Sequence, residues 1–258
     1  MTTQAEQKVT GTYIYCVLPS TEEDVKELGA AIDASQSLRT VREDGLVAII
    51  SDAVRDKYDP SRANISAHEG VVHHAFEHGD VLPMRFGTVA QNEGAVQRFL
   101  HDKHDDLEHS LGHLHGRVEM ALKVSWDRDL MFREILGEDE NVRSLREQVL
   151  AQPGEAAHEA RVELGRLVTE ALERRRTTMS NRILDALRPQ AVDVEVQRQL
   201  SENMVLNAAF LVERSALDAF DEAVSAIAVR GDAGLLNFKY VGPLPPYSFV
   251  KIVVPKEG

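Results

Sequence analysis

The chain has 258 residues, with 29 Lys and Arg against 42 Asp and Glu, and its formal net charge is -13. Hydrophobic residues make up 43% and charged residues 28%, a mixture typical of a folded globular protein and not of a disordered one. The acidic excess repels phosphate backbones and argues against nucleic acid as a partner. A single cysteine, Cys16, excludes an intramolecular disulfide framework.

Length allows one large domain or two compact ones. No apolar run approaches the roughly 20 residues that span a bilayer. The first ten residues, MTTQAEQKVT, lack the apolar core of a secretion signal. We therefore expect a cytoplasmic protein that does not insert into a membrane.

The first half of the chain alternates β patterns with amphipathic helical patterns. We expect strands at 12–18, 38–41, 45–51 and 81–89, and helices at about 20–32, 66–79 and 92–114. Asp44 and Gly45 form a hairpin signal between the second and third strands. The five apolar residues at 46–50 predict a strand that is covered on both faces.

The second half shows the same kinds of pattern, with a long helical stretch after its first strand. We expect strands at 118–125, 192–196, 205–212, 235–241 and 247–254, and helices at 127–136, 142–150, 155–187 and 217–228. Gly116 is the predicted domain boundary.

The fold class that follows is α+β with two domains. The first, 1–116, is expected to be a mixed sheet with flanking helices. The second, 117–258, contains the strand-helix-strand-strand-helix-strand order of a ferredoxin-like sandwich, enlarged by a helical insertion at about 127–188.

Signatures of catalysis are missing from the chain. No glycine-rich phosphate loop follows a strand, and no G-x-S-x-G elbow is present. Cys16 lies inside a predicted strand, where a packed, inert thiol is the favoured interpretation. We expect no catalytic residues, no cofactor and no enzymatic activity.

Nine of the ten histidines lie between His68 and His115. Two pairs have the i, i+4 spacing that lets one helix face present two metal ligands. They are His74 with His78, and His109 with His113. Two such pairs bind zinc only if their helices meet, and imidazoles on solvated helix faces are the favoured interpretation. We therefore predict no metal site, and keep a metal-binding or small-ligand-binding ferredoxin-like protein with His-rich helices as the alternative.

Arginines stand out at two places. Arg85, in the apolar segment MRFGT, must face solvent or pair with a buried acid, for which Glu119 is the candidate. A structural role for Arg85 is favoured over a binding role. The run at 174–176 is interpreted as a solvated helix face that pairs with Glu170 and Glu173.

The segment 242–249, GPLPPYSF, places three prolines and two aromatic residues between the last two predicted strands. Rigid proline segments lose little entropy on docking. The segment can therefore serve as an intramolecular clasp or as an interaction edge for a partner, and both interpretations stay open.

Five segments together resemble the gas vesicle protein F/L family. They are YIYCVLP at 13–19, LPMRFGTV at 82–89, GRVEMALKVSW at 116–126, LNAAFLV at 206–212 and GPLPPYSFV at 242–250. LPMRFGTV and GPLPPYSFV are the specific ones. The resemblance implies two α+β domains, the second a modified ferredoxin-like fold with inserted helices.

The resemblance also implies a function. Members of the family are accessory proteins needed to build gas vesicles, and they are not enzymes. The implied location is the gas vesicle. The implied partners are the small hydrophobic wall protein and, beyond it, other accessory proteins of the vesicle. The motif residues expected to have an interaction or structural role are Arg85, Phe86, Gly87, Gly242, Pro243, Pro245, Pro246 and Tyr247.

Overall fold

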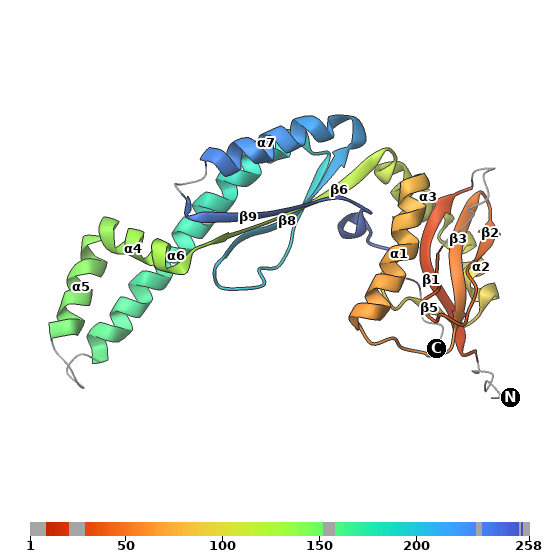
Figure 1. Cartoon of the computed structure of the whole chain (residues 1–258), viewed down its shortest axis with the longest axis horizontal. Helices are drawn as coiled ribbons and strands as arrows, with labels where there is room; N and C mark the ends of the chain where they lie inside the picture. The colour runs from red at the N-terminus through yellow and green to blue at the C-terminus, as the bar shows by residue number, and fades with distance from the viewer. Residues whose placement is uncertain (1–8, 21–28, 152–157, 231–233, 253, 255–258) are drawn as a thin grey trace. The chain divides into compact units, whose positions relative to one another are not determined.

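A computed structural model describes residues 9–20, 29–151, 158–230, 234–252 and 254 (Figure 1). The chain divides into two compact units. The first unit is Met1–Glu119 together with Pro243–Gly258, and the second is Met120–Gly242. The last residues thus belong to the first unit, whereas the sequence pattern assigned all of 117–258 to one domain. The physical reason is local, because Ser248 donates two hydrogen bonds to the carboxylate of Glu119.

The first unit is built on one sheet. Its strands are β1 (Gly11–Pro19), β2 (Arg39–Glu43), β3 (Leu46–Ala53), β4 (Leu82–Pro83) and β5 (Val89–Ala90). The order is β2-β3-β1-β4, and β5 also pairs with β1. Every one of these pairs runs antiparallel, so this sheet is not mixed in direction. The short β2–β3 hairpin makes that pair antiparallel, as the turn at Asp44 and Gly45 predicts.

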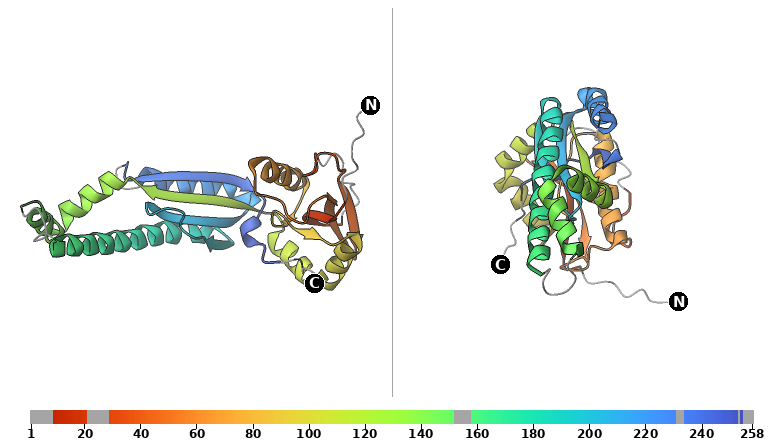
Figure 2. Two further views of the ribbon diagram at one scale, coloured as in Figure 1. Left: turned by 90° about the horizontal axis from the view of Figure 1, so that it is seen from below. Right: turned by 90° about the vertical axis from the view of Figure 1, so that its left-hand side faces the viewer.

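Three helices cover this sheet. They are α1 (Arg62–His78), α2 (Glu93–Asp102) and α3 (His104–Leu114). Figure 2 shows α1 on one face of the sheet and α2 with α3 on the other. Residues 46–50 of β3 are all 2% exposed or less. The prediction of a strand covered on both faces is confirmed.

Three boundaries in the first unit differ from the predicted ones. The helix α1 begins after Ser61, whose hydroxyl accepts a hydrogen bond from the backbone N–H of Asn64. The single helix predicted at 92–114 is interrupted at Lys103. The strand predicted at 81–89 is two short strands separated by a turn, at which Gly87 has a φ of 80°. The helix predicted at 20–32 falls mostly on 21–28, outside the described residues.

The second unit is built on four strands and four helices. They are β6 (Arg117–Trp126), α4 (Arg128–Glu138), α5 (Glu140–Ala151), α6 (His158–Leu187), β7 (Asp193–Val196), β8 (Met204–Glu213), α7 (Leu217–Arg230) and β9 (Leu236–Leu244). The sheet order β7-β8-β6-β9 is that of a ferredoxin-like sandwich with α4, α5 and α6 after its first strand. The α+β class and the ferredoxin-like second domain are confirmed.

Both α6 and α7 contact β8, and they also contact each other. The rings of Phe210 on β8 and Phe220 on α7 lie 5.3 Å apart, so the even-numbered residues of β8 face the helices. No helix among the described residues is long and apolar enough to cross a membrane.

The strand predicted at 247–254 is wrong for the residues that the structure describes there. Tyr247–Phe249 form a single 3-10 turn, labelled η5, and the following described residues are irregular. Pro245 and Pro246 precede the turn and cannot donate backbone hydrogen bonds to a sheet.

Candidate functional site

Both specific motif segments meet around one buried histidine of the first unit. His68 on α1 is 2% exposed. Its ring packs against Phe86, at 5.9 Å between centroids, and against Tyr247, at 6.2 Å. Tyr15 of β1 stacks on it at 5.7 Å. We call His68, Tyr13, Tyr15, Phe86 and Tyr247 the histidine cluster.

A chain of hydrogen bonds fixes the turn between β4 and β5 to this cluster. The Nε2 of His68 lies 3.1 Å from the carbonyl oxygen of Met84, which can only accept, so Nε2 carries the proton. The Nδ1 therefore accepts from the hydroxyl of Tyr13, at 3.1 Å. That hydroxyl in turn accepts from the backbone N–H of Gly87, at 2.9 Å. Burial lowers the pKa of His68 to about 4, so the imidazole is neutral near pH 7.

The C-terminal segment is held to the same unit by a buried carboxylate. Glu119 is 6% exposed, and its two oxygens accept from the N–H and the hydroxyl of Ser248, each at 2.8 Å. Burial raises the pKa of Glu119. The hydroxyl of Tyr247 is buried and has no hydrogen-bond partner among the residues that the structure describes, and burial raises its pKa. Tyr247 is thus held by packing and not by a polar contact.

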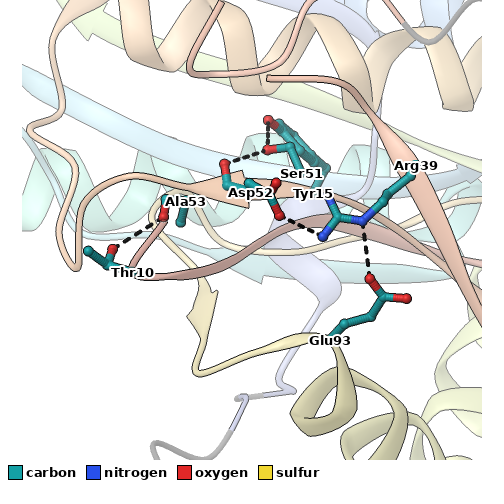
Figure 3. Close-up of polar contacts among 7 residues, drawn as sticks. All are labelled: Thr10, Tyr15, Arg39, Ser51, Asp52, Ala53 and Glu93. Atoms are coloured by element: carbon teal, nitrogen blue, oxygen red, sulfur yellow. Dashed lines mark hydrogen bonds and ion pairs between the residues drawn. The ribbon is translucent and has the colours of Figure 1, made fainter. Parts of the chain in front are cut away.

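Polar contacts also tie the sheet to α2 (Figure 3). Arg39 on β2 pairs with Asp52 on β3 at 2.7 Å and with Glu93 in the first turn of α2 at 3.1 Å. The hydroxyls of Tyr15 and Ser51 lie 3.0 Å apart, on neighbouring strands. The Tyr15–Ser51 contact ties β3 to β1, the strand that carries two of the three tyrosines of the histidine cluster.

The predicted pair of Arg85 with Glu119 is wrong. Arg85 is exposed, and it forms no ion pair with any residue that the structure describes. Its backbone carbonyl accepts from the hydroxyl of Thr88, at 2.6 Å, and so closes the turn. With the charged group of Arg85 in solvent, Ser248 supplies the hydrogen bonds that the carboxylate of Glu119 needs.

The remaining motif residues separate into two groups. Pro245 and Pro246 are buried, and Phe86, Gly87 and Tyr247 are partly buried. Gly242 and Pro243 are exposed, like Arg85. The first group packs within the first unit, and the second group is accessible.

The sequence-based reading missed the role of His68. In the sequence, His68 is counted only among the nine histidines at 68–115, yet it lies on the buried stripe of α1 with Val71, Val72, Ala75 and Phe76. A histidine on the apolar stripe of a helix is the available signal for a buried, hydrogen-bonded imidazole.

The histidine pairs do not form a shared ligand group. The Nδ1 of His78 is bonded to the carbonyl of His74, at 2.8 Å. In the described part of the chain, the group of three possible ligands consists instead of Glu43, Asp44 and His101. His101 bonds Asp44 at 2.9 Å, and this contact raises its pKa. Contacts of this kind, between a hairpin turn and a histidine on the exposed side of α2, are ordinary surface ion pairs.

One cavity of about 510 Å³ lies in the first unit, beside β5 and α2. Its charged lining residues are Asp56, Lys57, Arg98, Asp102 and Lys103. The described residues that line it include no histidine. The alternative of a ligand site made by the His-rich helices gains no support from it.

The polar groups around His68 bond one another. Both ring nitrogens of His68 are occupied by hydrogen bonds, and burial raises the pKa of the Cys16 thiol. The arrangement is a packed clasp that joins α1, the β4–β5 turn and the C-terminal segment.

The second unit has a different kind of accessible feature. Large apolar side chains are exposed at β7 and in the segments directly before and after it. They are Val192 at 43%, Val196 at 53% and Leu200 at 61% exposed. We call these three the valine edge. Others lie on the inserted helices, such as Leu130, Phe132, Leu150 and Val162. Exposed apolar groups gathered along one element mark candidate contact surfaces.

Comparison with known proteins gives matches along nearly the whole chain. Residues 11–251 match the family described as "Gas vesicle synthesis protein GvpL/GvpF". The chain is 32% identical over 241 residues to "Gas vesicle protein F" of Streptomyces sp. (strain CB03234). The matched residues make up 93% of this chain and 99% of that protein. It is 23% identical to "Gas vesicle protein L1" of Halobacterium salinarum, over 93% of this chain and 90% of that protein.

Solved structures show the same fold. The crystal structure of the gas vesicle protein GvpF from Anabaena sp. PCC7120 is similar with a TM-score of 0.81 and 27% identity, covering 95% of this chain and 99% of that one. GvpF from Microcystis aeruginosa is similar in fold, with a TM-score of 0.76 and 24% identity over 94% of this chain. The family match extends over both units, and the chain belongs to the gas vesicle synthesis protein GvpL/GvpF family.

Proposed function

We propose that this chain is an accessory protein of gas vesicle assembly, that it binds the small hydrophobic wall protein, and that it catalyses no reaction. The observation that carries the proposal is the family match over residues 11–251. The proposed place of action is the gas vesicle and the cytoplasm around it, and other accessory proteins of the vesicle are further proposed partners.

The surface chemistry of the chain suits this role. A strongly apolar wall protein needs a contact that covers apolar groups before it joins the shell. The second unit exposes Val196 and Leu200 beside a sheet edge, and the chain as a whole has a net charge of -13. The charge keeps a complex with an apolar protein dispersed.

Within the motif segments we propose a division of roles. Phe86, Gly87, Pro245, Pro246 and Tyr247 stabilise the first unit, because they pack or bond at the histidine cluster. Arg85, Gly242 and Pro243 are exposed, so these three are the motif residues available to a partner.

Two measurements test the proposed function. A strain without this gene should form no vesicles, and the wild-type gene should restore them; normal vesicles in the deletion strain would overturn the assembly role. Pull-down of the wall protein should persist as the salt concentration rises, since salt does not screen apolar contacts. Interactions between exposed charges, in contrast, are largely screened at separations beyond about 10 Å in 0.1 M salt. Loss of binding at moderate salt would keep the role but contradict an apolar contact.

A further inference from the structure

The strand β7 is an edge of the second sheet. It pairs with β8 on one side, and no described strand pairs with its other side. Its sequence is Asp-Val-Glu-Val, and of the valine edge Val192 directly precedes the strand, Val196 ends it and Leu200 lies in the following loop. An edge strand presents backbone groups that a second strand can bond.

The hydrogen-bond pattern shows which backbone groups point outward. Gln197 donates its backbone N–H to the carbonyl of Asn207 on β8, at 2.7 Å. In an antiparallel pair, residues alternate between bonding the neighbour and pointing away from it. Glu195 therefore turns its backbone toward β8, and Val194 and Val196 turn theirs away from it.

A side chain partly occupies this outer edge. The backbone N–H of Val194 donates to Oδ1 of the adjacent Asp193, at 2.8 Å. An outward N–H that is hydrogen-bonded to a neighbouring side chain is not free to pair non-specifically with another strand. This is one way in which a sheet edge is protected. Nevertheless, Val196, two residues further on, remains 53% exposed.

Two other sheet edges carry cationic side chains or proline. The edge strand β9 carries Lys239 and Pro243, and charged side chains and proline both oppose edge pairing. The edge strand β2 carries Arg39 and Arg42. In contrast, β7 contains no Lys, Arg or Pro, and its two charged residues are the acids Asp193 and Glu195. The edge strand β9 also exposes an apolar side chain, Val241 at 42%, but its Pro243 lacks a backbone donor, whereas every residue of β7 has one.

From this geometry we infer that β7 binds an extended apolar segment of the wall protein by strand addition, displacing the carboxylate of Asp193 from the N–H of Val194. The identity of the partner rests on the proposed function; the location rests on the edge itself. A strand supplies the complementary row of backbone donors and acceptors, and its apolar side chains cover Val192 and Val196.

A second copy of this chain is a poorer occupant. In a two-fold antiparallel pair of β7 strands, Asp193 and Glu195 of one copy would lie on the same face as those of the other. Like charges placed opposite one another destabilise a strand pair. An apolar segment without acids at these positions avoids that repulsion.

The test uses the full chain and overlapping synthetic peptides that cover the wall protein of the same organism. Val196→Pro removes an outward N–H but no hydrogen bond to β8, so the fold is retained, as circular dichroism checks. We choose the peptide that the wild-type chain binds most tightly, and expect Val196→Pro to bind it at least about tenfold more weakly. Proline removes one backbone hydrogen bond to the peptide, and its ring hinders the neighbouring ones. Val196→Thr keeps the N–H and should weaken binding less. Val229→Thr, at a residue 87% exposed on α7, is the matched control and should bind like the wild type.

Hydrogen exchange of the unmodified chain gives a readout that needs no variant. Bound peptide should slow exchange at the amides of Val194 and Val196. Peptide binding without this protection, and with unchanged affinity for Val196→Pro, would overturn the edge assignment but leave the proposed function in place. Peptides and intact wall protein that both fail to bind would overturn the two together. Self-association that Val196→Pro abolishes, with wall-protein binding unchanged, would assign the edge to a second copy and reject the inference.

Discussion

At the residue scale, two tyrosines of the histidine cluster have opposite hydrogen-bonding situations. The hydroxyl of Tyr13 joins Gly87 to His68, whereas the hydroxyl of Tyr247 is buried without a partner among the described residues. Both rings pack at His68. Removing each hydroxyl while keeping its ring therefore shows how much a hydrogen bond at His68 contributes to stability beyond ring packing.

We predict that Tyr13→Phe destabilises the chain and that Tyr247→Phe does not. The first change leaves the buried Nδ1 of His68 and the partly buried N–H of Gly87 without this partner. An unsatisfied buried group costs about 1–3 kcal/mol, so we expect a loss of about 2 kcal/mol. The second change removes a polar atom that is buried without compensation, and is neutral or stabilising. Denaturant titration of both variants measures the difference. Equal losses would mean that the relay through Tyr13 contributes nothing.

The buried imidazole also predicts a pH dependence. The pKa of His68 is lowered to about 4 in the folded chain, chiefly by burial, and is about 6.5 in an unfolded chain. Between these values the unfolded state binds more protons, so stability falls as the pH drops through that window. Between about pH 7 and pH 5 the expected loss is about 2 kcal/mol.

The control for this effect is His68→Gln, which cannot titrate. Its free energy of unfolding should fall less than that of the wild type over the same pH interval. The raised pKa of Glu119 acts in the opposite direction, since its contribution is lost as the pH rises, and it is common to both proteins. Parallel pH profiles for the two proteins would show that His68 is not the titrating group.

At the element scale, local patterns predicted most of the fold. The apolar run 46–50 and the Asp44-Gly45 turn are short-range signals, and β3 and its hairpin follow them. The stripe of the long helix likewise predicted α6. The interruption at Lys103 carries no periodicity signal and was not predicted. The one-turn η5 was missed although Pro245 and Pro246, directly before it, are a local signal against a strand.

The histidine cluster itself was beyond sequence reasoning. Tyr13, His68, Phe86 and Tyr247 are spread over most of the chain, and no spacing rule brings them together. Both specific motifs were recognised, but their meeting at His68 was not. A motif marks which residues matter, while the fold decides which of them touch.

Two neighbouring arginines on α6 provide a prediction at this scale. Arg175 pairs with Glu134 and Glu138 on α4, at partly exposed positions. Arg176 pairs with Glu173, as the sequence suggested, but it is buried, with its guanidinium 5.1 Å from the centre of the Trp126 ring. The run is therefore not a wholly solvated face. Its middle and last members link α6 to other elements of the second unit.

We predict that Arg175→Ala costs at most about 1 kcal/mol, as exposed ion pairs do. Arg176→Ala should cost more, about 2–4 kcal/mol, since it removes packing, a stacked cation and a bond to the carbonyl of Glu202. Only the first loss should shrink in high salt. Thermal or urea unfolding at two salt concentrations measures both changes, and a larger cost for Arg175→Ala would contradict the assignment.

At the scale of the whole molecule, the second unit is inserted into the first. The chain leaves the first unit after Glu119 and returns to it at Pro243. The returning segment supplies Phe249 and Val250 to the buried interior, and Ser248 to the carboxylate of Glu119. The first unit therefore depends on both ends of the sequence, and a fragment that stops at its first exit lacks part of its own core.

We predict that a chain truncated after Gly242 keeps a folded second unit but loses the first. The loss follows because Glu119 is left buried without its donor and Phe249 and Val250 are removed from the core.

The only tryptophan, Trp126, lies in the second unit, and its fluorescence reports that unit alone. Tyr13, Tyr15 and Tyr58 lie in the first unit, so near-ultraviolet circular dichroism follows its packing. We expect unchanged tryptophan emission, a weakened tyrosine signal and faster proteolysis of residues before Glu119. A chain ending at Val254 is the control, because it retains all of the residues that make these contacts. If the tyrosine signal survives truncation at Gly242, the C-terminal segment is an accessory to the first unit and not part of its core.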